Sequence, residues 1–285
     1  MNNGTGLVLE GGAMRGVFTA GVIDVMMENG LTFKYCVGVS AGAAFGCNYK
    51  SNQPGRVLRY NLKFCRDPKY CSFRSLIRTG NIFGTELCYH DIPERLDPFD
   101  VEAFEKNPME FYIVCTDVVT GKAYYKRLDR IGSDGYDWIR ASASMPLVSQ
   151  IVELDGGKYL DGGVTDSIPL RFGEQFCERN IAVLTRPRDY IKKPASNMWL
   201  YRRRLKEYPE MVRAIAERHT MYNDQRDFVF AREKEGRVFV ICPDEPLDIG
   251  RIEHKAEKIQ KAYDVGRKTA ERQLDQIRRF IENDN

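Results

Sequence analysis

Ser40 lies in the pentapeptide Gly38-Val39-Ser40-Ala41-Gly42, which has the form G-x-S-x-G. In this pattern the serine sits on a sharp turn between a strand and a helix, and small neighbours let the backbone bend. The turn exposes the hydroxyl at a helix N-terminus, where backbone N–H groups favour developing negative charge. An apolar run precedes Ser40 and a small-residue run follows it, as the pattern requires. The sequence therefore predicts that Ser40 is a nucleophile.

A second glycine-rich segment, GGAMRG, follows the first apolar run of the chain. Such a loop can aim backbone N–H groups outward and bind an oxyanion or a phosphate. A dinucleotide site is disfavoured, because Ala13 replaces the second glycine of that fingerprint and no acidic residue ends the next strand. In a parallel sheet this loop and Ser40 would face each other, which favours an oxyanion hole. Its candidate residues are Gly11, Gly12, Ala13, Met14, Arg15 and Gly16.

A serine nucleophile also needs a base, and the sequence offers two kinds. Asp161 begins an Asp-Gly-Gly turn with Gly162 and Gly163 after an apolar run. His219 and His254 follow Ser40 in the chain, as the order of an α/β-hydrolase triad requires. That fold places several strands before its nucleophile, whereas Ser40 ends only the second predicted strand. A two-member Ser–Asp site is simpler, and the histidine triad stays an alternative.

Short apolar strands alternate with helices and must position these residues. Strands are predicted near 7–9, 35–39, 111–117, 123–128, 159–161, 181–185 and 237–242, and helices near 17–29, 41–49, 56–65 and 136–143. Strands joined by helices predict an α/β fold with right-handed crossovers. Residues 66–100 are loop-rich and form a candidate lid. After a connector at 186–197 the chain is mostly helical, and it ends in an amphipathic helix near 252–281.

Composition excludes several classes of protein. The 285 residues carry a net charge of only +3, so no nucleic-acid partner is expected. Eight cysteines form no CxxC pair and there are three histidines, so no metal site is predicted. No signal peptide and no apolar run of about 18 residues is visible, which favours a cytoplasmic location.

Membrane contact is therefore expected to be peripheral. Residues 186–285 carry 23 Lys/Arg against 18 Asp/Glu. Within them, Trp199-Leu200-Tyr201 precedes Arg202-Arg203-Arg204, a combination that suits an anionic headgroup interface. The alternative is a solvated helix with Trp199 and Leu200 packed inward.

The three motifs, in this order, resemble the patatin-like phospholipases. The resemblance rests on residues 11–16, 38–42 and 161–163, and the segments 114–122 and 141–146 are similar to stretches of that family. It covers about residues 5–187, a predicted catalytic domain, and leaves a helical region at 195–285 that we expect to pack on it.

The resemblance implies a three-layer α/β/α fold with a mainly parallel sheet, and a Ser–Asp dyad. Ser40 is then the nucleophile that attacks a lipid ester, and Asp161 is its base. Gly12 and Ala13 are the best oxyanion donors, and no metal or organic cofactor is implied. The family usually has glycine at Ala13, where alanine still offers its N–H provided that the backbone needs no positive φ. Ser167 stands where many members have asparagine.

Two other functions remain open at this point. One is a histidine-triad esterase that uses His219 or His254. The other is a non-catalytic scaffold of the same fold that binds lipid or a protein partner, an idea supported only by the substitution at Ala13.

Overall fold

The computed structural model of the chain describes residues 4–282, within which eight strands form one mixed sheet. In chain order the strands are β1 (Thr5–Leu9), β2 (Tyr35–Val39), β3 (Glu110–Asp117), β4 (Lys122–Arg127), β5 (Val152–Leu154), β6 (Gly157–Asp161), β7 (Arg179–Val183) and β8 (Val238–Ile241). Their order across the sheet is β5-β6-β3-β2-β1-β7-β8, with β4 also paired to β3. From β3 to β8 the neighbours run parallel, whereas β4, β5 and β6 pair antiparallel.

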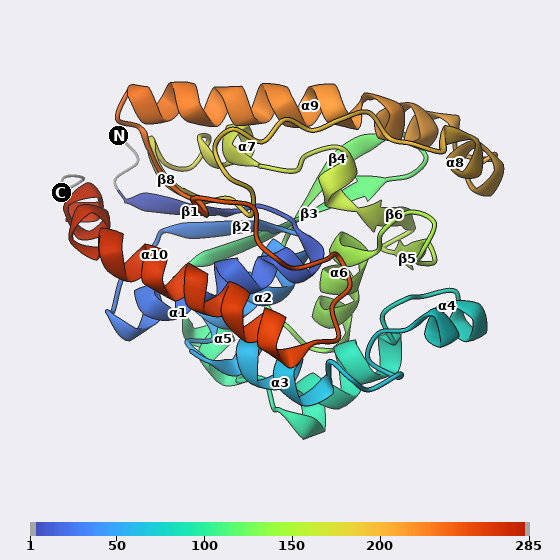
Figure 1. Cartoon of the computed structure of the whole chain (residues 1–285), viewed down its shortest axis with the longest axis horizontal. Coiled ribbons are helices and arrows are strands. Elements are labelled where there is room, and N and C mark those ends of the chain that lie inside the picture. Colours follow the sequence, from blue (N-terminus) through green and yellow to red (C-terminus); the bar gives the residue numbers. More distant parts are fainter. Residues whose placement is uncertain (1–3, 283–285) are drawn as a thin grey trace.

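Helices lie on both faces of this sheet and give the three layers predicted from the sequence (Figure 1). They are α1 (Gly16–Glu28), α2 (Ala41–Lys50), α3 (Arg56–Phe64), α4 (Phe73–Thr79), α5 (Val101–Lys106), α6 (Ser133–Ala143), α7 (Leu170–Gly173), α8 (Met198–Arg204), α9 (Pro209–Lys234) and α10 (Ala256–Glu282), with the 3₁₀ turns η1 (Ala13–Arg15) and η3 (Gly162–Val164) and the π-helix η2 (Leu87–Leu96). In Figure 1, α7 and α9 cover one face, and α1, α2 and α10 cover the other.

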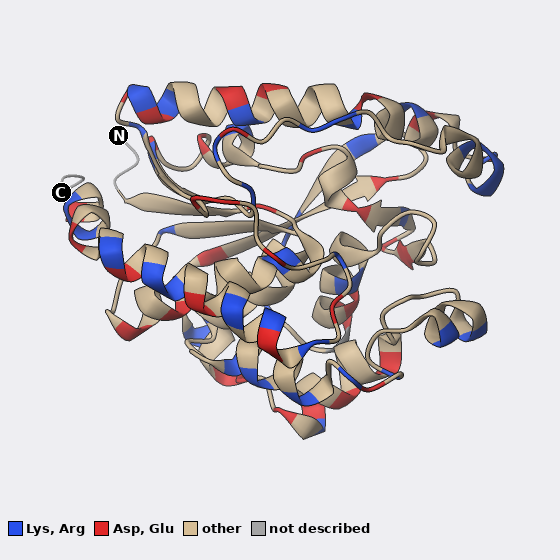
Figure 2. Ribbon diagram, viewed as in Figure 1, with Lys and Arg blue, Asp and Glu red and all other residues tan. Residues whose placement is uncertain are grey.

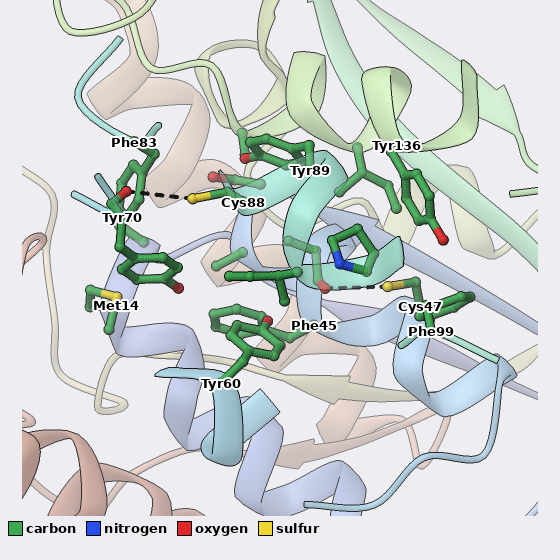
Figure 3. A pocket seen from close by; sticks show the side chains of 18 of the residues that line it. Met14, Phe45, Cys47, Tyr60, Tyr70, Phe83, Cys88, Tyr89, Phe99 and Tyr136 are labelled. Atoms are coloured by element: carbon green, nitrogen blue, oxygen red, sulfur yellow. Dashed lines mark hydrogen bonds between the residues drawn. The ribbon is translucent and has the colours of Figure 1, made fainter. Parts of the chain in front are cut away.

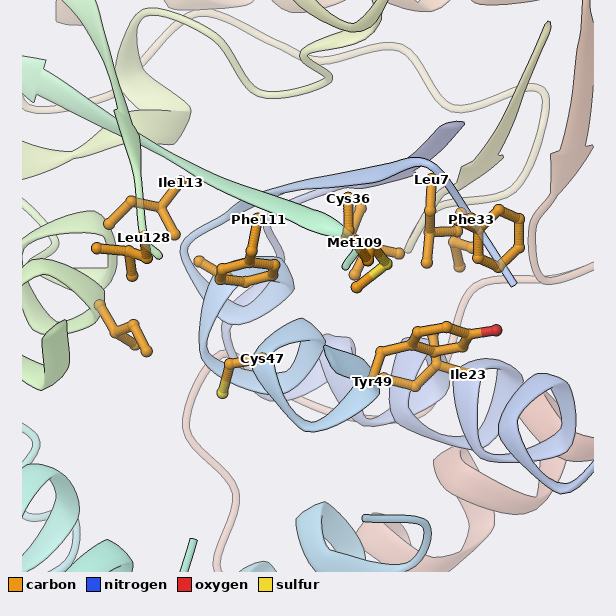
Figure 4. Packing of buried hydrophobic residues seen from close by; sticks show 14 of the residues in the cluster. Leu7, Ile23, Phe33, Cys36, Cys47, Tyr49, Met109, Phe111, Ile113 and Leu128 are labelled. Atoms are coloured by element: carbon orange, nitrogen blue, oxygen red, sulfur yellow. The ribbon is translucent and has the colours of Figure 1, made fainter. Parts of the chain in front are cut away.

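The core follows from the alternation of side chains along the central strands. In β1, Leu7 and Leu9 pack toward α1 and α2, whereas Val8 packs toward the α9 side. Cys36 of β2 and Phe111 of β3 join the first of these layers, which Figure 4 shows between the sheet and α2. Because each fully buried aliphatic side chain contributes about 1.5–3 kcal/mol, the two apolar layers hold the strand ends in fixed register.

The region from 66 to 100 is more ordered than a loop-rich reading suggests. It contains α4 and the π-helix η2, which has Pro93 inside it. A π-helix does not follow the 3.6-residue period by which helices are predicted. Proline is also normally absent from a helix interior, so the sequence pattern does not reveal this helix.

The C-terminal residues contribute to all three layers. β8 pairs with β7, α9 covers one face, and α10 packs along α1 on the other. The contact of α1 with α10 is unusually close at two glycines. A Cβ on Gly266 would lie 2.1 Å from the carbonyl oxygen of Phe18, and one on Gly21 would lie 2.2 Å from that of Tyr263. No other residue type fits at these positions without moving a helix.

We therefore expect Gly266→Ala to lower the free energy of unfolding by about 1–3 kcal/mol. This sign opposes helix propensity, which alone would make alanine about 1 kcal/mol more favourable than glycine. Urea denaturation measures the change. Lys268→Ala, at an exposed position of the same helix, is the control and should change stability by less than about 0.5 kcal/mol. Equal or greater stability of Gly266→Ala would show that α10 does not pack against α1 in this way.

Candidate active site

Ser40 and Asp161 are brought together by two strands that meet end to end on one edge of β3. β2 pairs with β3 as far as Val39 opposite Val114, and β6 begins its pairing at the next residue, with Asp161 opposite Cys115. β4 pairs with the other edge of β3 from Tyr112 to Asp117, so it overlaps the end of the β2 stretch and all of the β6 stretch. The residue after β2 and the last residue of β6 therefore adjoin, and Ser40 Oγ donates a hydrogen bond to Asp161 Oδ2 at 2.9 Å.

The backbone at Ser40 is strained, as the predicted turn requires. Its φ of +55° and ψ of −119° lie where residues with side chains are rarely found, which costs about 1–3 kcal/mol. Two glycines permit this turn. A Cβ on Gly38 would lie 2.5 Å from the carbonyl oxygen of Gly42, and one on Gly42 would lie 2.4 Å from that of Leu9. Helix α2 begins at Ala41, so Ser40 stands at its N-terminus.

Ser142 supports this turn from α6. The backbone N–H of Ser40 donates to Ser142 Oγ at 2.9 Å, and the Ser142 hydroxyl donates to the carbonyl oxygen of Val114 at 2.6 Å. The side chain is fully buried, so both bonds form without competition from water. Ser142 thus ties α6 to the place where β2 and β6 meet.

Asp161 is buried and both of its carboxylate oxygens are hydrogen-bonded. Oδ2 accepts from Ser40, and Oδ1 accepts from the backbone N–H of Gly163 at 2.7 Å. Burial raises the pKa of Asp161, while Arg218, the Gly163 amide and the Ser40 hydroxyl oppose this rise. A carboxylate with a raised pKa is a stronger base than an ordinary aspartate, so this one is suited to accept the hydroxyl proton. Gly162 packs against β3 without entering the site.

The glycine-rich loop after β1 lies beside Ser40. A Cβ on Gly11 would lie 3.2 Å from the Cβ of Ser40, and one on Gly12 would lie 2.7 Å from Thr185 Oγ1. Among residues 4–282, no hydrogen-bond partner is found for the backbone N–H of Gly12 or Ala13. These two amides are therefore available to an oxyanion.

The last three residues of that loop, Met14, Arg15 and Gly16, line the two cavities or pack against α2. Met14 lines an apolar cavity, and Arg15 lines a polar one. Gly16 begins α1 and packs on Ala41, because a Cβ there would lie only 2.7 Å from the Ala41 methyl group.

Alanine can replace glycine in this loop without strain only if the backbone needs no positive φ, and Ala13 does not meet this condition. Its φ is +48°, in the left-handed region. An alanine there costs about 1–2 kcal/mol relative to a right-handed conformation, although its N–H group is retained. The loop keeps its shape, and the rest of the fold compensates for the strain.

Two cavities meet at Ser40, and Ala13 and Met145 line both of them. The first is mainly apolar and is surrounded by aromatic side chains, as Figure 3 shows. The π-helix η2 forms part of its wall, so residues from the candidate lid segment line the cavity directly. The labelled aromatic side chains in the wall are Phe45, Tyr60, Tyr70, Phe83, Tyr89, Phe99 and Tyr136.

The second cavity is polar and basic. Asp161 and Glu10 contribute its carboxylates. Glu10 is buried and accepts hydrogen bonds from the hydroxyl groups of Tyr222 at 2.8 Å and Thr185 at 3.1 Å. The cationic lining residues are Arg15, Arg186, Lys192, Arg218 and Arg251.

The histidines lie elsewhere. Nδ1 of His219 is 3.0 Å from the carbonyl oxygen of Ala216, and Nδ1 of His254 is 2.7 Å from that of Cys65. Neither histidine lines either cavity. In the part of the chain that the structure describes, no group of three or more His, Cys, Asp or Glu side chains could hold a metal ion.

The sequence motifs do not predict a role for Ser142 or for the cations other than Arg15. Ser142 lies in the 141–146 segment, so its position in a family-like stretch was a usable signal. Arg186, Lys192 and Arg218 have no such motif, because the connector that carries the first two and the helix that carries Arg218 meet only in the folded chain.

The fold is that of a patatin-like protein, and comparison with known families agrees. The chain belongs to the patatin-like phospholipase family, whose family model matches residues 7–172, more than half of the chain. A second family model, for a domain of unknown function (DUF6363), matches residues 208–282.

Individual relatives are distant. The uncharacterized protein YjjU of Escherichia coli K12 is 26% identical over 272 residues, which cover 92% of this chain and 74% of that protein. Lysophospholipase nte1 of Aspergillus niger is 30% identical over 176 residues, which cover 57% of this chain and 10% of that protein. The solved structure of VipD from Legionella pneumophila is 12% identical with a TM-score of 0.47, over 96% of this chain and 67% of that one.

The strain at Ala13 leads to a stability prediction. Ala13→Gly should raise the free energy of unfolding by about 0.5–1 kcal/mol, because relief of the left-handed strain exceeds the entropy that glycine adds to the unfolded chain. Ala103→Gly, in the helical backbone of α5, is the matched control and should lose about 1 kcal/mol. Thermal and urea unfolding measure both variants. If both were equally destabilised, the left-handed conformation at Ala13 would be refuted.

Proposed function

We propose that the protein hydrolyses acyl esters of lipids, with Ser40 as the nucleophile and Asp161 as its base. The observation that carries this proposal is the 2.9 Å hydrogen bond from Ser40 Oγ to Asp161 Oδ2, on a strained turn where two cavities meet. Membership of the patatin-like phospholipase family supports a lipid ester as the substrate. The lysophospholipases among its distant relatives support it further.

The reaction follows from the positions of these groups. Asp161 accepts the Ser40 proton as Oγ attacks the ester carbonyl carbon, and the amides of Gly12 and Ala13 stabilise the resulting oxyanion. When the tetrahedral intermediate collapses, Asp161 returns the proton to the departing alcohol and leaves an acyl group on Ser40. Asp161 then takes a proton from the water that attacks the acyl-enzyme carbonyl carbon. When this second tetrahedral intermediate collapses, Asp161 gives the proton to the departing Ser40 Oγ, which releases the carboxylic acid and restores the free enzyme.

The apolar cavity suits the acyl chain of such a substrate. It begins at Ser40 and is walled by side chains such as Phe45, Tyr60 and Tyr89 (Figure 3). Burial of each methylene group there contributes about 0.8 kcal/mol to binding. The alcohol part of the ester then lies in the polar cavity.

Ser40→Ala and Asp161→Asn should each lower kcat/KM for a short acyl nitrophenyl ester by at least about a thousandfold. The first variant loses the nucleophilic hydroxyl, and the second loses the carboxylate that accepts its proton. Turnover and circular dichroism are measured on the same samples, so that loss of fold is recognised. His219→Ala and His254→Ala are the controls and should retain activity, because neither side chain lines a cavity. Retained turnover in Asp161→Asn, or its loss in a histidine variant, would exclude the dyad. Failure of a fluorophosphonate to label Ser40 would instead favour a non-catalytic scaffold.

We further propose that the protein meets anionic membranes through α4 and α8. Trp199 on α8 is 59% exposed, which supports an outward-facing side chain, and Phe73 and Ile77 on α4 are 73% and 87% exposed. Both helices also carry exposed arginines, and they lie at the same end of the molecule in Figures 1 and 2. Exposed apolar and basic side chains together suit a headgroup interface. Among the described residues, no helix is long and apolar enough to cross a bilayer.

Sedimentation with phosphatidylglycerol vesicles tests this contact. Phe73→Ser with Ile77→Ser, and separately Trp199→Ser, should each reduce the bound fraction several-fold, because apolar burial is lost. Val101→Ser, at an exposed apolar position of α5, is the control and should bind as the wild type does. Unchanged binding in both α4 and α8 variants would reject this surface.

A further inference from the structure

The polar cavity beside Ser40 gathers five cationic side chains from distant parts of the chain. Arg15 comes from the loop after β1, Arg186 follows β7, Lys192 lies in the connector, Arg218 is on α9 and Arg251 precedes α10. None of the five forms an ion pair within residues 4–282. Nε of Arg15 is buried and has no hydrogen-bond partner there. Partly buried cations without an ion-pair partner, such as Arg15 and Lys192, are costly unless an anion binds among them.

The two carboxylates of this cavity do not balance the cations. Glu10 is buried and bonded to Tyr222 and Thr185, and Asp161 is bonded to Ser40 and to a backbone amide. Five cationic side chains against two carboxylates leave the cavity with an excess of three positive charges when all are ionised.

The cations are close enough to affect one another. Burial lowers the pKa of Lys192 to about 7, with further lowering by Arg218, Arg15 and Arg251. Burial also lowers the pKa of Arg15 to about 10, with further lowering by Arg186 and Arg251. The side chains therefore converge on one space. They are also held in place: the Lys192 backbone bonds to Asn223, and its ammonium lies 4.2 Å from the ring centroid of Tyr222.

We propose that this cavity binds a terminal phosphate group that carries two negative charges. The phosphate belongs to the alcohol part of the substrate ester, and the acyl chain of the same ester occupies the apolar cavity. This inference rests on the proposed function for the position of the ester, but the phosphate site itself does not require catalysis. Arginines bind phosphate oxygens through paired N–H groups, and the lysine adds a point charge.

The charge excess also predicts which lipids are disfavoured. A phosphocholine headgroup has no net charge and would bring a trimethylammonium group among the five cations. A neutral monoacylglycerol would leave those cations unpaired. Monoacylglycerol phosphate has the charge that fits, so the protein should prefer it over both at equal acyl chain.

The first test measures binding without turnover. Inorganic phosphate is titrated calorimetrically into full-length Ser40→Ala, and we expect saturable binding at one site. Lys192→Gln and Arg251→Gln, each added to Ser40→Ala, should weaken it about tenfold, as loss of a hydrogen bond to a charged group does. Lys193→Gln is the matched control, since Lys193 is exposed and does not line the cavity. Absence of phosphate binding, or equal effects of Lys192→Gln and Lys193→Gln, would overturn the site.

The second test distinguishes a headgroup from free phosphate. Wild type, Lys192→Gln and Lys193→Gln are compared on monoacylglycerol phosphate, monoacylglycerophosphocholine and monoacylglycerol of one chain length. We expect kcat/KM to be at least about tenfold higher for the phosphomonoester, and this preference to shrink only in Lys192→Gln. Phosphate binding without any such preference would contradict the headgroup assignment and leave a site for free phosphate. If none of the lipids is hydrolysed, the proposed function fails, whereas the calorimetric result still decides the phosphate site.

Discussion

The geometry of the site depends on how β3 shares its edge between two strands. β2 and β6 approach from opposite directions and stop at adjacent residues, Val114 and Cys115, so that the end of each strand faces the other. A shift of one residue in either pairing would turn Ser40 or Asp161 to the opposite face of the sheet. The apolar layers above and below the sheet prevent that shift, because it would also move alternating core residues into the wrong layer. Core packing and the hydrogen bond between Ser40 and Asp161 are thus set by the same register.

Most of the fold and the two central side chains were predictable from the sequence, for identifiable reasons. The central strands β1, β2, β3, β7 and β8 contain short apolar runs, and the G-x-S-x-G and Asp-Gly-Gly segments mark the turns after β2 and β6. The π-helix η2 was not predictable, because it has no regular period and contains Pro93. The left-handed conformation of Ala13 was also hidden, since the residue type argues against it. The basic cavity could not be predicted, because its side chains are separated by up to 236 positions, from Arg15 to Arg251, and meet only through tertiary structure.

The C-terminal region has a larger part in the site than its position in the sequence suggests. The patatin-like family model ends at residue 172, and four of the five cations of the polar cavity lie beyond it. Two of them, Arg218 and Arg251, fall in the segment that matches the domain of unknown function. Arg218 also donates a hydrogen bond to the carbonyl oxygen of Gly163, next to the turn that holds Asp161. We infer that the proposed nucleophile and base belong to the family scaffold, while the cationic surroundings of the proposed leaving alcohol come largely from residues after the part of the chain that the family model matches.

The pairing of β8 with β7 also has a consequence for attempts to shorten the protein. β7 is buried and lies between β1 and β8, so its backbone groups are satisfied on both sides. A fragment that ended soon after β7 would leave this strand, which contains the apolar sequence Ile181-Ala182-Val183, with one row of unpaired N–H and C=O groups. Such an edge can pair with the same edge of another molecule, which leads to aggregation. The part of this chain that ends soon after β7 is therefore a poor candidate for expression by itself, even though the family motifs lie within it.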